Sequence, residues 1–352
     1  MGVVDDRSAD LAAVEAARGG DGTAFAALVE PHRGELRVHC YRLLGSFDEA
    51  EDLVQETFLL AFRGFSRFTT DGSWSVRAWL YRIATNACLN ALTRSPRRVL
   101  PTQLGPASDP HLPLHPPVDR PWLQPFPDHM LPEIPSADAD PESAAVSRET
   151  IELAFLAAIQ LLPPRQRAAL ILRDVVGWPA REVAGALEQS VASVNSALQR
   201  ARATLQEHLP ERRIDWGPQS EPTDDERQVL SRYMAAHENA DAAELARVLS
   251  ADVRGSMPPH PTWFEGREAV LVASRHGFDP ASPLYTGRLR TVATRANGQP
   301  AAACYAWDVA EGGFRAFSLD VLRIVDGEIV EIVGFGPDRF PSFDLPAVLA
   351  DR

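Results

Sequence analysis

Hydrophobic residues recur at three- and four-residue spacing along the first part of the chain, which predicts amphipathic helices. The clearest of these helices cover residues 23–44, 48–65 and 75–93. In the second helix, the apolar stripe expected to face the core contains Ala50, Val54, Thr57 or Phe58, Ala61, Phe65 and Phe68. Residues 10–98 are therefore predicted to form an all-α helical bundle.

Helical periodicity returns in residues 142–209 and is interrupted there by a very short turn. A short helix over residues 179–187 and a long helix over residues 191–207 flank a Glu-Gln-Ser turn, in which Ser190 is the expected N-cap. The apolar positions expected to hold the two helices together are Val183, Ala184, Leu187, Val191, Val194, Leu198 and Ala201. This arrangement predicts a helix-turn-helix unit, whose second helix enters the major groove of DNA with its N-terminal half.

In residues 222–352, helical periodicity is followed by alternating apolar and polar positions, the pattern of β-strands. Asp326 and Gly327 separate two apolar runs and predict a tight hairpin turn that requires positive φ. Helices followed by an antiparallel sheet that ends in a hairpin predict an α+β cone.

Residues 99–141 separate the two helical regions and contain a proline every few residues. Proline favours extended chain, so this segment is predicted to be a semi-rigid linker. The linker also contains Trp122, Leu123, Phe126 and Met130, which are more apolar side chains than a spacer needs. We therefore expect it to dock on a surface.

The charge of the chain restricts the kind of partner it can bind. The formal net charge is −13, and the basic residues are arginines, with no lysine in the sequence. Such an acidic chain does not coat DNA or an anionic membrane by bulk electrostatics, so a DNA contact must be local or assisted by a partner. The N-terminus lacks the apolar core of a secretory signal and no segment is long enough to span a bilayer, which predicts a cytoplasmic protein. The cysteines have neither disulfide nor zinc-site spacing, so no metal or other cofactor is expected.

The helix over residues 48–65 has a row of carboxylates away from its apolar stripe. Asp48, Asp52 and Glu56 lie four residues apart, with Gln55 beside them, and like charges at this spacing repel one another. A solvated helix start, where acids interact favourably with the helix dipole, accounts for Asp48 and Asp52. It accounts poorly for Gln55 and Glu56, for which a basic partner surface is the alternative.

The next segment, residues 72–98, inverts the charge and contains no carboxylate. Its arginines and aromatic residues are Trp74, Arg77, Trp79, Tyr81, Arg82, Arg94, Arg97 and Arg98. Arginines bind phosphates and aromatic rings stack on bases, so this composition is typical of a single-stranded nucleic acid site. Asn86 and Asn90 share one helix face, and an Asn amide can pair with a base edge through a donor and an acceptor. The residues assigned to the core instead are Leu80, Ile83 and Ala87.

The sequences EAEDLVQETFLLAFRGFSRF and SVRAWLYRIATNACLNALTR resemble domain two of the sigma-70 family, specifically its small extracytoplasmic-function group. This resemblance implies that the first helix docks on the β′ clamp of core RNA polymerase. The residues expected to face the polymerase are Asp48, Asp52, Gln55 and Glu56.

The same resemblance implies that the second helix and the loop before it melt and contact the minus-ten promoter element. Residues 69–74 would form a base-capturing loop, and Asn86 would contact the captured strand. Flipping a base out of the stack costs a few kcal/mol, which the binding pocket must offset. The residues expected to bind DNA in this domain are Trp74, Arg77, Arg82, Asn86 and Asn90.

Residues 178–205 are similar to sigma domain four, which binds the minus-thirty-five promoter element. The residues expected to face DNA are Ser193, Asn195, Ser196, Gln199 and Arg200, with Arg202 nearer the phosphates. The segment departs from the family pattern, because Glu188 replaces a common turn glycine and Asn195 and Ala197 stand where arginines are frequent. Fewer positive charges release fewer counterions, so we expect this domain to bind DNA weakly by itself.

The sequence SADVRGSMPPHPTWFEGREAVLVASR resembles the SnoaL-like members of the nuclear-transport-factor-two-like superfamily. Some relatives of this cone are isomerases or cyclases that use an Asp or His base. Residues of suitable type are His237, Asp252, His260, His276, Tyr285, Tyr305 and Asp308, and no spacing singles out a pair. We favour a cone that modulates the other domains without catalysis, and a small ligand in the cone is left open.

Together the patterns predict a multidomain protein with two all-α sigma domains, a helical bundle and a helix-turn-helix, and an α+β cone. The main hypothesis is a sigma factor that binds core RNA polymerase and directs promoter-specific transcription initiation. The alternative is a ligand-responsive DNA-binding regulator that acts without polymerase, which tight sequence-specific binding by the free chain would favour. A cyclase-like enzyme with a DNA-binding arm is a third hypothesis.

Overall fold

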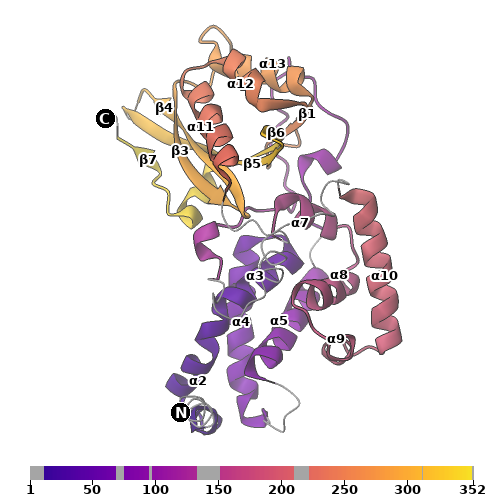
Figure 1. Cartoon of the computed structure of the whole chain (residues 1–352). Coiled ribbons are helices and arrows are strands. Elements are labelled where there is room, and N and C mark those ends of the chain that lie inside the picture. The colour runs from indigo at the N-terminus through magenta and orange to yellow at the C-terminus, as the bar shows by residue number, and fades with distance from the viewer. Residues whose placement is uncertain are drawn as a thin grey trace. The chain divides into compact units, whose positions relative to one another are not determined.

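The described residues fall into two compact units. The computed structural model describes residues 12–68, 75–94, 97–132, 151–209, 222–310 and 312–350. We call the first unit, residues 1–97, 130–139 and 154–215, the helical unit, and the second, residues 98–129, 140–153 and 216–352, the cone unit. Figure 1 shows helices in the first unit and a helix-covered sheet in the second.

The N-terminal part of the helical unit is a helical bundle. Its elements are α2 (Gly22–Val29), a 3₁₀ turn (Glu30–His32), α3 (Arg33–Leu44), α4 (Phe47–Gly64), a 3₁₀ turn (Phe65–Arg67) and α5 (Val76–Leu92). The helices predicted over residues 48–65 and 75–93 are confirmed. The single helix predicted over residues 23–44 is wrong, because Pro31 lacks the backbone N–H that a helix interior requires and lies instead in the first turn of the 3₁₀ segment.

The buried face of α4 packs against α3 and α5. Ala50, Val54 and Ala61 are each at most 1% exposed, as the apolar stripe predicts. At the position where the sequence left two candidates, Thr57 is the buried residue, and its hydroxyl donates to the carbonyl oxygen of Leu53 at 2.6 Å. That hydrogen bond satisfies the only polar group that Thr57 brings into the core.

The second part of the helical unit contains the predicted helix-turn-helix. Its elements are α7 (Leu153–Ile159), α8 (Pro164–Leu170), a π-helical segment (Ile171–Val175), α9 (Ala180–Leu187) and α10 (Val191–His208). The Ser190 hydroxyl accepts a hydrogen bond from the backbone N–H of Ser193 at 3.1 Å, which confirms Ser190 as the N-cap. Glu188 adopts a φ of 54° in the turn, the conformation for which glycine is better suited. Val191 was expected in the core, but this first residue of α10 is 42% exposed, so that expectation is wrong.

The cone unit combines three helices with a curved sheet in its described residues. The helices are α11 (Asp224–Glu238), α12 (Ala242–Val248) and α13 (Arg267–Phe278). The strands are β1 (Leu249–Ser256), β2 (Trp263–Glu265), β3 (Leu289–Ala296), β4 (Gln299–Asp308), β5 (Gly313–Val325), β6 (Glu328–Phe335) and β7 (Val348–Leu349). They lie in the order β2-β1-β6-β5-β4-β3, with β7 paired to β5. The predicted hairpin turn joins β5 to β6, with φ of 52° at Asp326 and 77° at Gly327.

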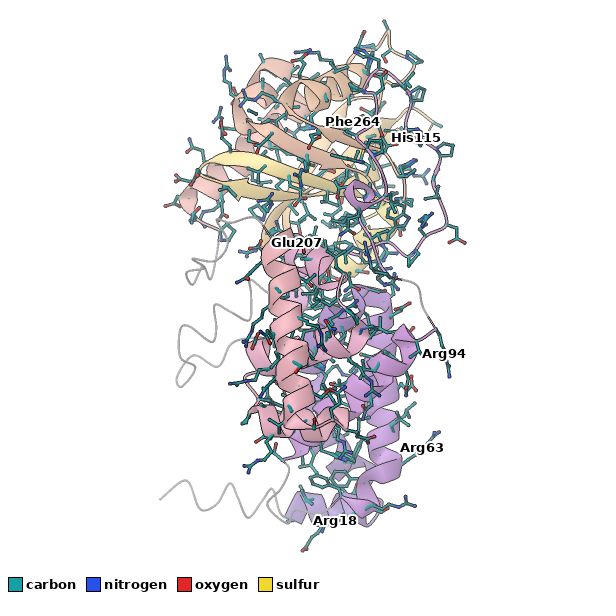
Figure 2. All side chains as sticks on the ribbon, turned by 90° about the vertical axis from the view of Figure 1, so that its right-hand side faces the viewer. Arg18, Arg63, Arg94, His115, Glu207 and Phe264 are labelled. Carbon is teal, nitrogen blue, oxygen red and sulfur yellow. The ribbon has the colours of Figure 1, made fainter. Side chains whose placement is uncertain are left out.

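The linker docks on the cone within the cone unit, as its apolar residues predict. Leu123 and Phe126 are at most 1% exposed. Phe126 exchanges hydrogen bonds with Asn297, at 2.8 Å to the side-chain oxygen and 2.9 Å from the backbone N–H of Asn297. His115 donates its backbone N–H to the hydroxyl of Thr262 at 2.8 Å, close to Phe264 (Figure 2). These contacts hold the linker as a strap on the sheet.

Candidate functional site

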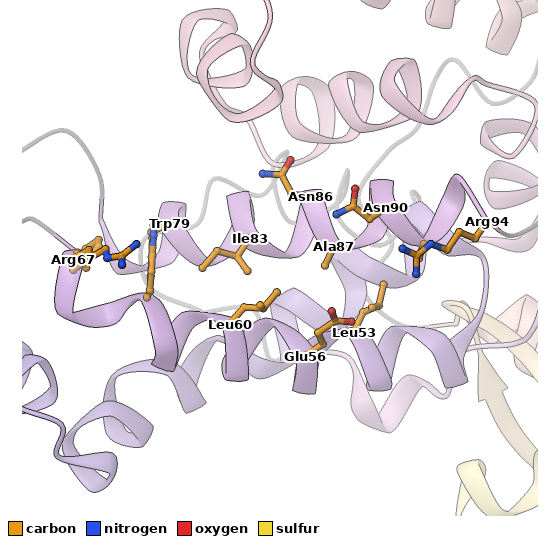
Figure 3. Close-up of a pocket in the computed structure, with 13 residues that line it drawn as sticks. Leu53, Glu56, Leu60, Arg67, Trp79, Ile83, Asn86, Ala87, Asn90 and Arg94 are labelled. Carbon is orange, nitrogen blue, oxygen red and sulfur yellow. The ribbon is translucent and has the colours of Figure 1, made fainter.

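A groove of about 560 Å³ lies between α4 and α5 (Figure 3). Its lining residues on α4 and the following turn are Leu53, Glu56, Leu60, Gly64, Arg67 and Phe68. Its lining residues on α5 and at its end are Trp79, Ile83, Asn86, Ala87, Asn90, Ala91 and Arg94. The groove therefore joins the predicted polymerase helix and the predicted DNA helix in one concave surface.

The groove has a mixed chemistry that suits a nucleotide. The side chains of Asn86 and Asn90 come from successive turns of α5, and each amide offers both a donor and an acceptor. Arg67 and Arg94 lie toward opposite ends of the groove (Figure 3), where they can attract phosphates. Ile83 was assigned to the core but is only half-buried, because it forms part of the apolar floor of the groove.

The α4 helix presents the predicted acidic residues to solvent. Asp48, Asp52, Gln55 and Glu56 are all exposed. Their neighbour Glu51 instead pairs with Arg37 of α3 and so does not add to the exposed row. Glu51 is thus used inside the bundle, whereas Asp52 and Glu56 lie on the exposed surface of α4.

Exposed apolar side chains continue this acidic face of α4. Leu59, Leu60 and Phe62 are 59%, 41% and 44% exposed. Large exposed apolar side chains that lie together mark surfaces for other proteins. Sequence reasoning missed these residues, although they lie off the buried stripe and could have been identified from that register.

Arg77 lies in a network with Glu35 and Tyr81. Its Nε donates to the Glu35 carboxylate at 2.7 Å, and its guanidinium lies 4.8 Å from the centre of the Tyr81 ring. The Tyr81 hydroxyl donates to the same carboxylate at 3.1 Å. Burial acts to raise the pKa of Glu35, but hydrogen bonds from His32 and Arg77 outweigh it and hold the pKa below its usual value. Tyr81, expected as a ring on which bases stack, is only 4% exposed, so that expectation is wrong.

Within the helical unit, the helix-turn-helix part packs against the bundle. Arg82 of α5 lies 3.4 Å from the carboxylate of Glu188 in the turn before α10. The ring centres of Tyr81 and Trp178 are 5.9 Å apart. The buried Arg167 of α8 donates to the carbonyl oxygen of Leu43 at the end of α3. Burial lowers the pKa of Arg167 to about 10.

The residues predicted to face DNA on α10 form one exposed surface. Those residues are Ser193, Asn195, Ser196, Gln199, Arg200 and Arg202. Arg202 donates to Asp174 of the π-helical segment at 2.9 and 2.7 Å. Ala197, one of the two positions at which the family often has an arginine, is 6% exposed and lies in the core.

Other predicted site residues are less informative. Trp74 and the remainder of the loop over residues 69–74 lie outside the described residues. In the cone, His237 contacts Tyr233, Asp252 accepts from the Ser250 hydroxyl, and Tyr305 packs against Phe340. These three residues, named as candidate catalytic bases, therefore each contact a different neighbour.

Sequence reasoning missed a buried polar cluster in the cone. The carboxylate of Asp320 accepts from the Tyr233 hydroxyl at 3.0 Å and from the Cys304 thiol at 3.3 Å. Burial raises the pKa of both Tyr233 and Cys304. The three residues are too far apart in the sequence to have been grouped without the sheet register.

Among the residues that the structure describes, no group of three or more His, Cys, Asp or Glu side chains is placed to hold a metal ion. No described helix is long and apolar enough to cross a bilayer.

The chain is similar to known transcription factors over most of its length. Family models match it as Sigma-70 region 2 over residues 28–98, Sigma-70 region 4 over residues 152–205, and a SnoaL-like domain over residues 230–332. It is 42% identical over 326 residues to the ECF RNA polymerase sigma factor SigG of Mycobacterium tuberculosis (strain H37Rv), covering 92% of this chain and 84% of that relative.

Further similarities concern parts of the chain and the fold. The chain is 32% identical over 200 residues to the RNA polymerase sigma-H factor of Pseudomonas aeruginosa, covering 57% of this chain and 93% of that protein. Among solved structures, it is similar to the crystal structure of the Mycobacterium tuberculosis extracytoplasmic function sigma factor SigJ. The TM-score is 0.57 at 21% identity, and the match covers 92% of this chain and 99% of that one. This last similarity shows a shared fold of helical domains and a cone.

Proposed function

Because the chain belongs to the extracytoplasmic-function sigma factors of RNA polymerase, we propose that its α4 face docks on the β′ clamp and its groove captures minus-ten DNA. Members of this family bind core RNA polymerase and promoter DNA. The chain is accordingly a transcription initiation factor and not an enzyme, and its site of action is the cytoplasm, where RNA polymerase works.

The observation that best supports DNA capture is that Asn86 and Asn90 line the same groove, which has arginines toward its ends. Removing a base from the stack costs a few kcal/mol of stacking and pairing free energy. Hydrogen bonds to the edge of the base and contacts with apolar side chains must offset this cost. The Asn amides offer the hydrogen bonds, and Trp79 and Ile83 offer the apolar contact. Arg67 and Arg94 would bind the phosphates on either side of the captured base.

Docking on the β′ clamp is supported by the composition of the α4 face. Its exposed acids, Asp52 and Glu56 among them, fit a partner with basic side chains. The exposed Leu59 and Phe62 fit a partner that also has apolar side chains. Burial of these apolar groups would stabilise the complex, while the carboxylates would select and orient the partner.

Minus-thirty-five binding is assigned to the exposed face of α10. Its N-terminal half has Ser193, Asn195 and Ser196, which can hydrogen-bond to base edges. Arg82 of the bundle has a carboxylate partner in the turn before this helix, Glu188. We infer that the Glu188 carboxylate weakens any contact of Arg82 with a phosphate, because the carboxylate neutralises part of the arginine charge and repels the phosphate.

The cone is assigned a modulating role through the linker. Asp128 of the linker and Asn297 of the β3–β4 turn hold these two segments together. The Asp128 carboxylate accepts from the backbone N–H of Gly298 at 2.8 Å and from the Arg295 guanidinium at 2.9 Å. The cone therefore constrains the chain segment that connects the two sigma domains. This role does not require the small ligand that the sequence leaves open.

The test is reconstituted transcription with core RNA polymerase on DNA selected from a genomic pool. Transcripts with defined start sites are expected, and a truncation after Pro210 should change their yield. Absence of transcripts from folded full-length protein would contradict the assigned role. Tight sequence-specific binding by the free chain under those conditions would favour the regulator that acts without polymerase.

A further inference from the structure

The carboxylate of Glu35, on α3, is the centre of a polar network that reaches α5. The Nε of Arg77 donates to one Glu35 oxygen at 2.7 Å, and a terminal nitrogen of the same guanidinium lies 2.6 Å from that oxygen. The Tyr81 hydroxyl donates to the same oxygen at 3.1 Å. His32, in the turn before α3, lies 2.6 Å from the other oxygen. Glu35 therefore binds two side chains of α5 that are one helical turn apart.

A second contact joins the same two helices one turn further along. The Thr85 hydroxyl donates to the Tyr81 carbonyl oxygen at 2.7 Å, so its oxygen is left to accept from Nε2 of His39 at 2.8 Å. His39 follows Glu35 by four residues on α3, as Thr85 follows Tyr81 on α5. His39 and Thr85 are both 0% exposed. We call Glu35, His39, Arg77, Tyr81 and Thr85 the α3–α5 network.

The α3–α5 network lies on the side of α5 opposite the groove. Asn86 follows Arg77 by nine residues, and Asn90 follows Tyr81 by nine residues. Nine residues are about two and a half turns of an α-helix, so each groove asparagine leaves α5 on the side opposite a network residue. Asn86 and Asn90 line the groove, and neither Arg77 nor Tyr81 does (Figure 3). The rotation of α5 about its axis therefore sets both faces at once.

Apolar packing specifies this rotation less closely than the network does. The buried residues of α5 include the small side chains Ala84, Ala87 and Cys88. Hydrophobic contact is non-directional, so small side chains allow a helix to turn with little loss. Hydrogen bonds weaken steeply when their geometry is distorted, and those to an ionised carboxylate are about twice as strong as neutral ones. The contacts of Glu35 therefore oppose a rotation of α5 that its apolar contacts would tolerate.

A small rotation is enough to displace the side chains that line the groove. An atom at the helix surface lies about 5 Å from the axis, so a rotation of about 10° moves it by about 1 Å. Binding groups must be held within about 0.5 Å of the geometry in which they bind. Asn86 and Asn90 are therefore sensitive to a rotation that would leave the fold intact.

We propose that Glu35 is a positioning residue of the groove, which sets the rotation at which α5 presents Asn86 and Asn90 to the minus-ten strand. Arg77 and Tyr81 connect Glu35 to α5. Arg77 was expected to bind DNA, but two of its nitrogens are directed to Glu35, whose negative charge also repels a phosphate. This inference rests on the proposed function, because it requires that the groove capture minus-ten DNA.

The test measures base discrimination by the full chain assembled with core polymerase. Discrimination is the ratio of the affinity for a selected unpaired minus-ten strand to the affinity for a strand of equal length with the minus-ten bases replaced. A variant that is only less stable loses the same factor from both affinities, so the ratio stays constant. A variant in which α5 is rotated lowers the ratio, because base contacts specify the sequence and phosphate contacts do not.

Glu35→Gln keeps the size of the side chain and removes its charge, and it should lower the ratio about fivefold to tenfold. Glu30→Gln is the matched control, because Glu30 also pairs with an arginine, Arg33, at 2.6 Å. That variant should keep the wild-type ratio. Tyr81→Phe removes only a hydroxyl and should lower the ratio by a smaller factor, which provides a second variant if Glu35→Gln folds poorly.

Two further measurements show whether Glu35 acts through the groove. In an Asn86→Ala background, Glu35→Gln should lower the ratio by a much smaller factor, because one of the side chains that Glu35 positions is absent. Arg77→Gln should lower the ratio without changing the slope of log affinity against log salt. A phosphate contact by Arg77 would instead reduce that slope by about 0.7 for single-stranded DNA.

The outcomes distinguish this inference from the proposed function. If the wild type shows no discrimination, DNA capture by the groove fails. If the wild type discriminates, Asn86→Ala lowers the ratio, and Glu35→Gln and Tyr81→Phe do not, the positioning role of Glu35 fails alone. An equal effect of Glu35→Gln in both backgrounds, or a reduced slope for Arg77→Gln, would also overturn it. A lower ratio for Glu35→Gln with a wild-type ratio for Glu30→Gln supports it.

Discussion

Arg202 on α10 donates hydrogen bonds to both carboxylate oxygens of Asp174, at 2.9 and 2.7 Å. Asp174 belongs to the π-helical segment Ile171–Val175, so this pair ties α10 to the element before the helix-turn-helix. Segments of π-helix occur often at functional sites. The bidentate geometry fixes the plane of the guanidinium next to the surface proposed to bind DNA.

Replacement of Arg202 should reduce the salt dependence of promoter binding. If Arg202 contacts one phosphate, Arg202→Gln should lower the slope of log affinity against log salt by about 0.9. Fluorescence anisotropy with the assembled polymerase complex and promoter duplex measures this slope. Arg165→Gln, at an exposed position of α8, is the control, and an equal change in both variants would contradict a specific phosphate contact by Arg202.

Replacement of Asn86 should weaken capture of the minus-ten strand. Asn86→Ala removes an amide that pairs with a base edge, which is expected to cost about 1–3 kcal/mol of binding to DNA with an unpaired minus-ten strand. Binding to fully paired upstream DNA should not change. Thr93→Ala at the end of α5 serves as the control, and an Asn86→Ala variant with wild-type affinity for the unpaired strand would sink the groove assignment.

Charge reversal on α4 should prevent association with core polymerase. Glu56→Arg and Asp52→Arg each replace an exposed acidic side chain by a basic one. Because like charges that face each other across an interface cost several kcal/mol, each variant is expected to lose at least about tenfold in affinity. Asp52 does not line the groove, so its variant separates docking from DNA capture. Asp225→Arg, at an exposed position of α11, makes the same charge change elsewhere, and a pull-down that retains normal assembly for both α4 variants would refute the docking surface.

Removal of the Phe126 side chain should destabilise the cone unit and change transcription. Phe126→Ala leaves a cavity at a residue that is 0% exposed, which is expected to cost about 3–5 kcal/mol in unfolding free energy. Calorimetry measures that loss, and reconstituted transcription measures its consequence. Gln124→Ala, at a half-buried linker position, is the control. Unchanged transcript yield over a dose series would remove the modulating role of the strap.

His39 should make the helical unit less stable as the pH falls below about 6.5, its ordinary pKa. Burial lowers the pKa of His39 to about 3 in the folded chain. Between these values the unfolded chain binds a proton that the folded chain does not, so the unfolding free energy falls by roughly 1.4 kcal/mol per pH unit at full effect. The unfolding free energy is therefore highest above pH 6.5 and decreases as the pH falls from 6.5 toward 3.

Thermal unfolding from pH 7 to pH 5 measures this effect. In that window most carboxylates stay ionised, so the acid loss should come mainly from His39 and from His237 of the cone, whose pKa is also lowered by burial. The Nε2 of His39 lies 2.8 Å from the Thr85 hydroxyl, and Gln can retain a hydrogen bond there. His39→Gln should therefore give a flatter pH dependence. An identical slope in wild type and variant would show that other groups cause it.

Local sequence determined the elements of this protein. The stripe through Ala50 and Ala61 predicted α4, Ser190 predicted the start of α10, and Asp326 with Gly327 predicted the β5–β6 turn. Each of these features depends on residues that are near one another in the chain, where capping, turn geometry and helical spacing act directly. Exposure of the acids on α4 follows from the same register.

Only the tertiary structure decided which side chains meet. Tyr81 was expected to meet bases, but helix packing turns it toward Glu35, 46 residues away in the sequence. The Arg82–Glu188 pair spans 106 residues, and no local pattern indicates it. The groove that joins Glu56 with Asn86 exists because α4 packs against α5. Periodicity specifies the buried face of each helix, but the choice of partner for that face depends on how all the helices pack at once.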